Sequence, residues 1–187
     1  MTFRRVPPDL NALLGALDAR GVLFVVTGSV AALLHGLSLE PGDLDITPSL
    51  DRENLERLAR SLDDLRARLD PDEPFGRWET DAQGERRWVT FEPTDADREG
   101  RARWRPDPAE ISTFDHVLQT RHGTLDVVPV LSGTYEELRP RAIEVDVNGR
   151  RVRVESIADQ LATLTVPRRQ KDIERVRGLR TLQRAIG

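Results

Sequence analysis

The sequence predicts an α/β (α+β) fold, with strands and helices interspersed along one domain. Three observations support this prediction. The chain has 187 residues, which suggests one domain, or one domain with a small helical appendix. Short apolar runs of strand length occur at 22–26 and 127–131. Leucines at helical spacing occur at 10–17 and again at 55–69.

The first part of the chain gives the clearest signals for individual elements. Asp9 is a candidate N-cap for the first helix, and Gly21 is expected to end it. In order, we predict a helix over 10–20, a buried strand over 22–26, a turn at 27–29, a short helix over 30–35, a strand over 43–47 and a long helix from Asp51 to about Leu69. The apolar stripe of the long helix consists of Leu55, Leu58, Leu62, Leu65 and Leu69.

Residues 70–110 differ from the rest because prolines recur there and helical periodicity is lost. Trp78 and Trp88 flank Gln83-Gly84, which predicts a hairpin. We expect 98–105 to be an arginine-rich loop. Because long loops in compact domains are often functional, this region is treated as an insertion into the domain.

The remaining elements are two hairpins and two helices. We predict a strand over 114–119, a tight turn at 121–123, a strand over 125–130, a hairpin over 143–154, a helix from Ile157 to about Thr165 and a last helix over 170–186, with Pro167 between the two helices. Asn148-Gly149 is a strong type I′ turn signal, and Ser156 is a candidate N-cap. We therefore expect a domain over 1–155, with C-terminal helices over 156–187 packed on it.

The bulk composition excludes several classes of protein. Net charge is -4, so the chain is not a globally basic nucleic-acid binder. There is no cysteine, which rules out disulfides, thiolate metal sites and cysteine nucleophiles. No apolar run approaches the roughly 20 residues that a membrane helix needs, and residues 1–8 do not have the apolar core of a signal peptide. We expect a cytoplasmic protein with no membrane contact.

Asp43 and Asp45 are the strongest candidates for chemistry. They are two residues apart on a predicted strand, so both carboxylates should point to the same face, while Leu44 and Ile46 point to the core. Two carboxylates aimed together repel each other unless a cation lies between them. Mg²⁺, or Mn²⁺, suits that role because it takes hard oxygen ligands from one or two carboxylates and from substrate phosphates.

A phosphate site is predicted at Gly28-Ser29, at the junction of a strand and a helix. Glycine lets the backbone approach a ligand closely, and the N–H groups at a helix N-terminus suit a phosphate. A third carboxylate is expected nearby, as a base or as a further metal ligand. Asp126 is the best candidate, because it is the one charge in the apolar run Leu125–Val128. Its alternative interpretation is a satisfied polar residue at a strand end.

These residues resemble the signature of the nucleotidyltransferase superfamily. The signature is Gly-Ser, a spacer, and then Asp-hydrophobic-Asp; here Gly28-Ser29 is followed by thirteen residues and then by Asp43-Leu44-Asp45. The segments 152–161 and 168–173 resemble the C-terminal part of the abortive-infection-type and minimal nucleotidyltransferase toxins. The resemblance covers about 21–176, and its middle part matches poorly.

The resemblance implies a short mixed sheet flanked by helices and transfer of a nucleotide from an NTP with Mg²⁺. Gly28 and Ser29 would contact the triphosphate, Asp43 and Asp45 would bind metal, and Asp126 would be the third acid. Lys171, the only lysine, and Asp172 are the candidates for a phosphate-binding lysine and an aspartate of the toxin members. The chain departs from that pattern at 163–165, where a lysine is often found, and at Arg175, where an acid is often found.

The expected function is NMP transfer from an NTP, such as ATP, to an acceptor hydroxyl. One version is the toxin of a toxin–antitoxin pair, which acts on tRNA and has a cognate antitoxin as its partner. The alternatives are a small-molecule transferase of the antibiotic type and a degenerate NTP-binding module. His116 is a further candidate for the site. The tryptophans are expected to be core or hairpin residues rather than base-stacking ones.

Overall fold

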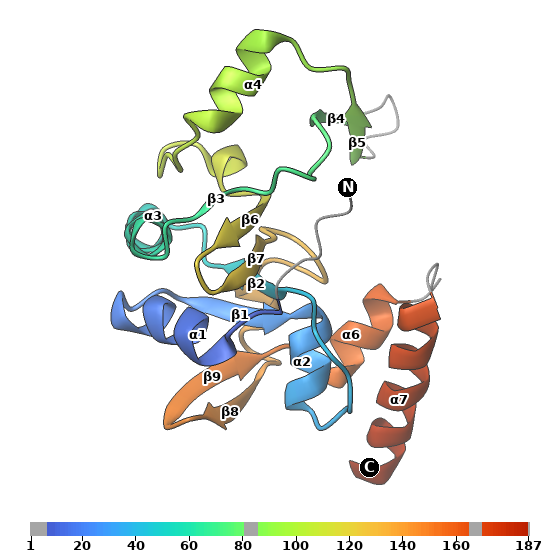
Figure 1. The fold of residues 1–187 in the computed structure, drawn as a ribbon. Helices are drawn as coiled ribbons and strands as arrows, with labels where there is room; N and C mark the ends of the chain where they lie inside the picture. The colour runs from blue at the N-terminus through green and yellow to red at the C-terminus, as the bar shows by residue number, and fades with distance from the viewer. Residues whose placement is uncertain (1–6, 81–85, 165–169, 187) are drawn as a thin grey trace.

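The protein, as a computed structural model, is described over residues 7–80, 86–164 and 170–186. It is a mixed α/β structure, which confirms the predicted fold class. The strands of the large sheet are β1 Phe24–Thr27, β2 Leu44–Pro48, β3 Arg68–Leu69, β6 His116–Thr120, β7 Gly123–Val127, β8 Ile143–Val147 and β9 Arg150–Val154. The strand order is β3-β6-β7-β2-β1-β9-β8 (Figure 1). Because β2–β7 and β1–β9 are parallel and the other pairs are antiparallel, the sheet is mixed.

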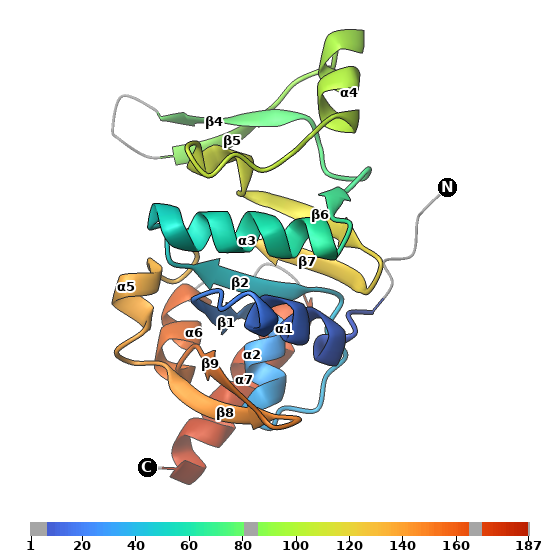
Figure 2. The ribbon, with the colours of Figure 1, turned by 90° about the vertical axis from the view of Figure 1, so that its left-hand side faces the viewer.

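Helices cover both faces of this sheet. The helices are α1 Leu10–Ala19, α2 Gly28–Leu34, α3 Arg52–Asp64, α4 Asp95–Ala102, α5 Tyr135–Leu138, α6 Ile157–Thr163 and α7 Gln170–Ile186. Figure 2 looks onto the face covered by α1 and α3, whose buried leucines pack on Leu44, Ile46 and Leu125. On the opposite face α2, α6 and α7 pack together through Ala32, Ile157 and Leu179. This second face carries the candidate site.

The long helix predicted from Asp51 is shorter than expected. Asp51 does cap it, accepting a hydrogen bond from the Asn54 N–H at 2.8 Å, but α3 ends at Asp64. Arg66 adopts a left-handed φ of 53°, which no helix can continue. Leu69 was therefore wrongly placed on the helical stripe, since it lies in β3 and pairs with Leu118 of β6.

The 70–110 region contains more regular structure than predicted. The expected hairpin is present as β4 Gly76–Thr80 and β5 Arg86–Thr90, with Trp78 opposite Trp88. Its predicted turn at 83–84 lies outside the described residues. The prediction of an arginine-rich loop over 98–105 was wrong, because most of these residues belong to α4. A capping box between Thr94 and Asp97 begins this helix, and Arg98 pairs with Asp95 at 3.1 Å within it.

The second half follows the prediction with small shifts. A short 3₁₀ turn over Ile111–Thr113 precedes β6, so the strand begins at His116 rather than at residue 114. Strand β7 ends at Val127, three residues earlier than expected. Asn148 and Gly149 have φ values of 55° and 82°, which confirms the tight turn of the β8–β9 hairpin. The predicted break at Pro167 lies outside the described residues. Within the described ranges, no helix has the length and apolarity to cross a membrane.

Candidate active site

The three predicted carboxylates line one cavity. Asp45 of β2 lies directly opposite Asp126 of β7 in the parallel register, and Asp43 lies one residue before β2. All three border a cavity of about 790 Å³, together with Gly28 and Ser29. The strand begins at Leu44 rather than at Asp43, but the side chains of both aspartates still line the same space.

The Asp45 carboxylate packs directly against Gly28. Gly28 has φ +65°, and a Cβ built on it would overlap the Asp45 carboxylate. The Ser29 backbone N–H lies close enough to that carboxylate to lower the pKa of Asp45. The predicted turn at 27–29 is in fact the start of α2, with Thr27 as its N-cap and Gly28 as its first residue. The absence of a side chain at Gly28 therefore makes room for Asp45.

The Ser29 hydroxyl is available for a ligand. Its Oγ is buried and, within the described part of the chain, has no hydrogen-bond partner. A buried polar atom without a partner is costly unless a bound group satisfies it. Because the Ser29 N–H already interacts with the Asp45 carboxylate, the hydroxyl is the polar atom of this residue that remains for a phosphate or an ion.

The electrostatics of the carboxylates favour a bound cation. Burial, together with the negative charges of Asp43 and Asp126, raises the pKa of Asp45 to about 8. Among the described residues, however, no three His, Cys, Asp or Glu side chains are gathered closely enough to hold an ion by themselves. The residues thus fit the binding mode in which one or two carboxylates share Mg²⁺ with substrate phosphates and water.

Helix α7 brings positive charge to the same cavity. Lys171, Asp172 and Arg175 all line it. Arg175 lies 3.6 Å from the Asp172 carboxylate, and its charge lowers the pKa of Asp45. From the sequence alone, Arg175 was a departure from the family pattern and was not expected in the site. The signal was present, because positions 171 and 175 are one helical turn apart and share a face.

Glu155 is a second residue near the site that was not expected from the sequence. It is 1% exposed, directly after β9, and its carboxylate lies close enough to the Gly28 N–H for that group to lower its pKa. Burial raises the pKa of Glu155 to about 7. Glu155 thus lies next to Gly28, the first residue of α2. The available signal was a single carboxylate directly after the alternating strand 150–154.

His116 lies on the other side of Asp45 and Asp126. The two aspartates and His116 border a smaller cavity of about 330 Å³, together with Glu73 and Trp88. Glu73 fixes the histidine ring, with His116 Nδ1 3.1 Å from Glu73 Oε2. The carboxylates therefore stand between two spaces. One space carries Lys171 and Arg175, and the other is walled by the 70–110 region.

The fold of this chain is similar to that of a solved protein. The solution structure of the antibiotic-resistance factor ANT(2'')-Ia is similar, with a TM-score of 0.51 and 17% sequence identity, covering 95% of this chain and 88% of that chain. The chain has a nucleotidyltransferase-like fold. The lincomycin-bound crystal structure of the lincosamide antibiotic adenylyltransferase LnuA gives a TM-score of 0.45 at 12% identity, covering 92% of this chain and 95% of that chain, and the fold assignment does not depend on it. By sequence, the chain matches no protein-family model and no curated protein.

Proposed function

We propose that this chain is a nucleotidyltransferase that moves a nucleoside monophosphate from an NTP to an acceptor hydroxyl with a divalent metal ion. The observation that carries the proposal is the close packing of Gly28 against Asp45, with Asp126 beside it in register. This packing joins the phosphate signature to the carboxylates in one cavity. The nucleotidyltransferase-like fold supports the same reaction.

The donor half of the site would bind the metal and the triphosphate. Asp43 and Asp45 would hold Mg²⁺ or Mn²⁺, which when bound supplies charge that neutralises the phosphates. The Ser29 hydroxyl and the two cations of α7, Lys171 and Arg175, would bind the outer phosphates. Arg175 would also attract Asp45 and so help to keep its carboxylate charged.

The chemical step is an in-line substitution at the α-phosphorus. The acceptor oxygen forms a new bond to phosphorus, and the bond from that phosphorus to the β-bridging oxygen breaks. Pyrophosphate leaves with the electron pair. Asp126 accepts the proton of the acceptor hydroxyl, since it lies beside Asp45 at the border of both cavities.

The direct test removes the metal-binding pair. The variant with Asp43→Ala and Asp45→Ala should lose transfer of label from an α-labelled NTP, while its circular dichroism spectrum and melting behaviour stay those of a folded protein. The matched control replaces two exposed aspartates outside the cavity, Asp63→Ala with Asp72→Ala, and should transfer normally. Full transfer by the first variant contradicts the proposal.

The acceptor has two candidate identities, and a third version of the function has no acceptor. The first is a small hydroxylated molecule, as suggested by the description of ANT(2'')-Ia as an antibiotic-resistance factor. The second is tRNA, modified by a toxin that has a cognate antitoxin; this version depends on the C-terminal sequence resemblance at 152–161 and 168–173. In the third version of the function, the fold serves only as an NTP-binding module and transfers nothing to an acceptor. Incubation with each α-labelled NTP, Mg²⁺, and either total RNA or hydroxylated small molecules separates the three.

A further inference from the structure

The 70–110 region builds a groove that begins at the candidate catalytic carboxylates. The cavity of about 330 Å³ shares Asp45 and Asp126 with the nucleotide cavity. A further cavity of about 210 Å³ continues from it, because both are lined by Glu73, Trp88 and His116. We call the combined space the hairpin groove; its main walls are Asp126, Asp115, His116, Glu73, Trp88 and Phe75.

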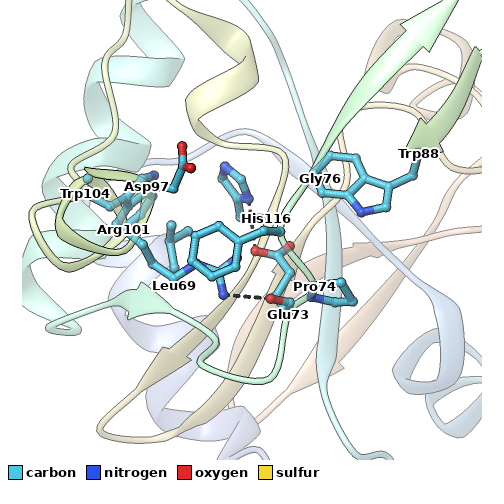
Figure 3. A pocket seen from close by; sticks show the side chains of 11 residues that line it. Leu69, Glu73, Pro74, Gly76, Trp88, Asp97, Arg101, Trp104 and His116 are labelled. Atoms are coloured by element: carbon cyan, nitrogen blue, oxygen red, sulfur yellow. Dashed lines mark hydrogen bonds and ion pairs between the residues drawn. The ribbon is translucent and has the colours of Figure 1, made fainter. Parts of the chain in front are cut away.

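Hydrogen bonds and ring contacts fix the floor of the hairpin groove. One oxygen of Glu73 lies 3.1 Å from His116 Nδ1, and the other accepts a hydrogen bond from the Val117 N–H at 3.2 Å. The ring of Trp104 meets that of His116 edge to face, with centroids 6.4 Å apart. Figure 3 shows His116 and Glu73 at the centre, with Trp88 on one side and Trp104 on the other. A wall held this firmly is pre-organised for a ligand.

The groove is acidic. Glu73, Asp97 and Asp115 line it beyond the two aspartates of the site. Among the residues whose side chains the structure describes, the one arginine or lysine that lines either cavity of the groove is Arg101, and it is already engaged. Arg101 donates a hydrogen bond to the Glu73 carbonyl oxygen at 2.6 Å, and its guanidinium carbon lies 3.7 Å above the centre of the Phe75 ring. An acidic wall attracts cations and repels phosphates, which is opposite to the charge that Lys171 and Arg175 bring to the nucleotide cavity.

The groove also has an apolar surface shaped by a glycine. A Cβ on Gly76 would overlap the Trp88 indole, so Gly76 is what allows the indole its position. Phe75, Pro74 and Leu69 extend the apolar surface. An indole face beside carboxylates suits a flat or apolar ring that carries a positive charge, because aromatic faces attract both.

From these features we infer that the hairpin groove is the acceptor subsite of the proposed transferase and takes a small molecule that combines a hydroxyl, a protonated amine and an apolar ring. The inference rests on the proposed function, because it places the acceptor hydroxyl beside Asp126. It favours a small-molecule acceptor over RNA, since a chain of phosphates would lie against Glu73, Asp97 and Asp115.

A matched set of probes tests the inference by binding, without relying on turnover. Ligand-observed NMR would compare 2-amino-1-phenylethanol, neutral 1-phenyl-1,2-ethanediol, anionic mandelate and ringless 2-aminoethanol, each with and without Mg²⁺ and ATP. We expect the amine with the ring to bind about tenfold more tightly than the diol or the ringless amine, as one charge-assisted contact or one stacked ring provides. Mandelate should bind most weakly. Equal or tighter binding of the diol or mandelate overturns the inference.

Two variants connect the binding to the groove. Gly76→Ala displaces Trp88 without changing any charge, and Glu73→Gln removes a charge while keeping an oxygen for the Val117 N–H. Each should weaken binding of 2-amino-1-phenylethanol about tenfold. Glu92→Gln makes the same charge change on an exposed residue that does not line the groove, and it should bind as the original chain does. If all three variants bind alike, the groove is not the subsite.

The outcomes for the inference and for the proposed function are distinguishable. If the amine binds as described but no NTP binds with Mg²⁺, the groove stands and the transferase proposal fails. If α-label is transferred to RNA and not to any amine, the transferase proposal stands and the assignment of the groove to a small cationic acceptor fails.

Discussion

The packing of Gly28 on Asp45 leads to a prediction that a single methyl group tests. Gly28→Ala places a Cβ where the Asp45 carboxylate lies, at a backbone φ of +65°. Gly21 is a matched control, because its φ is +64° and a Cβ there would meet only Arg57 Cδ at 3.9 Å, an ordinary contact. Both substitutions strain the backbone equally, and only Gly28→Ala displaces the carboxylate.

The expected magnitudes follow from this difference. Gly21→Ala should lower the free energy of unfolding by about 1–2 kcal/mol, the cost of a left-handed conformation for an L-residue. Gly28→Ala adds the displacement of the Asp45 carboxylate away from the Ser29 N–H, about 1.5–3 kcal/mol more. Transfer should fall about 100-fold in Gly28→Ala, the effect of moving a reactive group by roughly 1 Å, and should be unchanged in Gly21→Ala.

Urea denaturation and α-label transfer, measured on both variants, check these values. The reasoning is refuted if Gly28→Ala matches Gly21→Ala in stability and in transfer. It is also refuted if Gly28→Ala loses stability but transfers at the original rate, because the position of Asp45 would then be irrelevant to the chemistry.

Three further predictions concern charge and buried hydrogen bonds. Because the pKa of Asp45 is raised to about 8, the metal-free protein should lose stability as pH rises from about 4 to 8. Mg²⁺ should raise the melting temperature more at pH 8 than at pH 6. Asp45→Asn should remove both the pH dependence and the difference in the effect of Mg²⁺. The pKa of Glu155 is raised to about 7 by burial, so its contribution to stability falls between about pH 4.5 and 7; Glu155→Gln should add up to about 3 kcal/mol at pH 8 and nothing at pH 4 in urea denaturation. Buried Asn54 bonds to the N–H and carbonyl of Leu23 and to the carbonyl of Ser49, so Asn54→Ala should cost about 3–5 kcal/mol in the same assay, and a loss under 1 kcal/mol would contradict this account.

The nucleotide side of the site was predictable because its information is local in the sequence. A glycine at a strand-to-helix junction and two aspartates two apart on a strand are patterns within 18 residues of one another. The side chains of Asp43 and Asp45 line one cavity as expected, although Asp43 comes one residue before the strand rather than within it. The metal and nucleotide roles of these residues, and the catalytic role of Asp126, stay predictions.

The rest of the site could not be predicted because it depends on contacts between distant parts of the chain. Glu73 and His116 are 43 residues apart, and the sequence gives no register that would join them. The Ser29 N–H was expected to bind phosphate, but its proximity to the Asp45 carboxylate is visible only in the structure. Helix α4 could have been predicted, because the Thr94–Asp97 capping box that begins it is a sequence pattern. The many arginines of 98–105 were interpreted as a loop instead.

The central claim is that the chain transfers the α-phosphoryl group of an NTP with its nucleoside. The most direct measurement incubates the protein and Mg²⁺ with an amine-bearing alcohol and with NTP labelled at either the α- or the γ-phosphate. The account predicts that α-label moves to the acceptor, that γ-label appears only in pyrophosphate, and that chelation of the metal stops both. Transfer of γ-label to the acceptor would contradict the account, as would transfer that continues after the metal is removed.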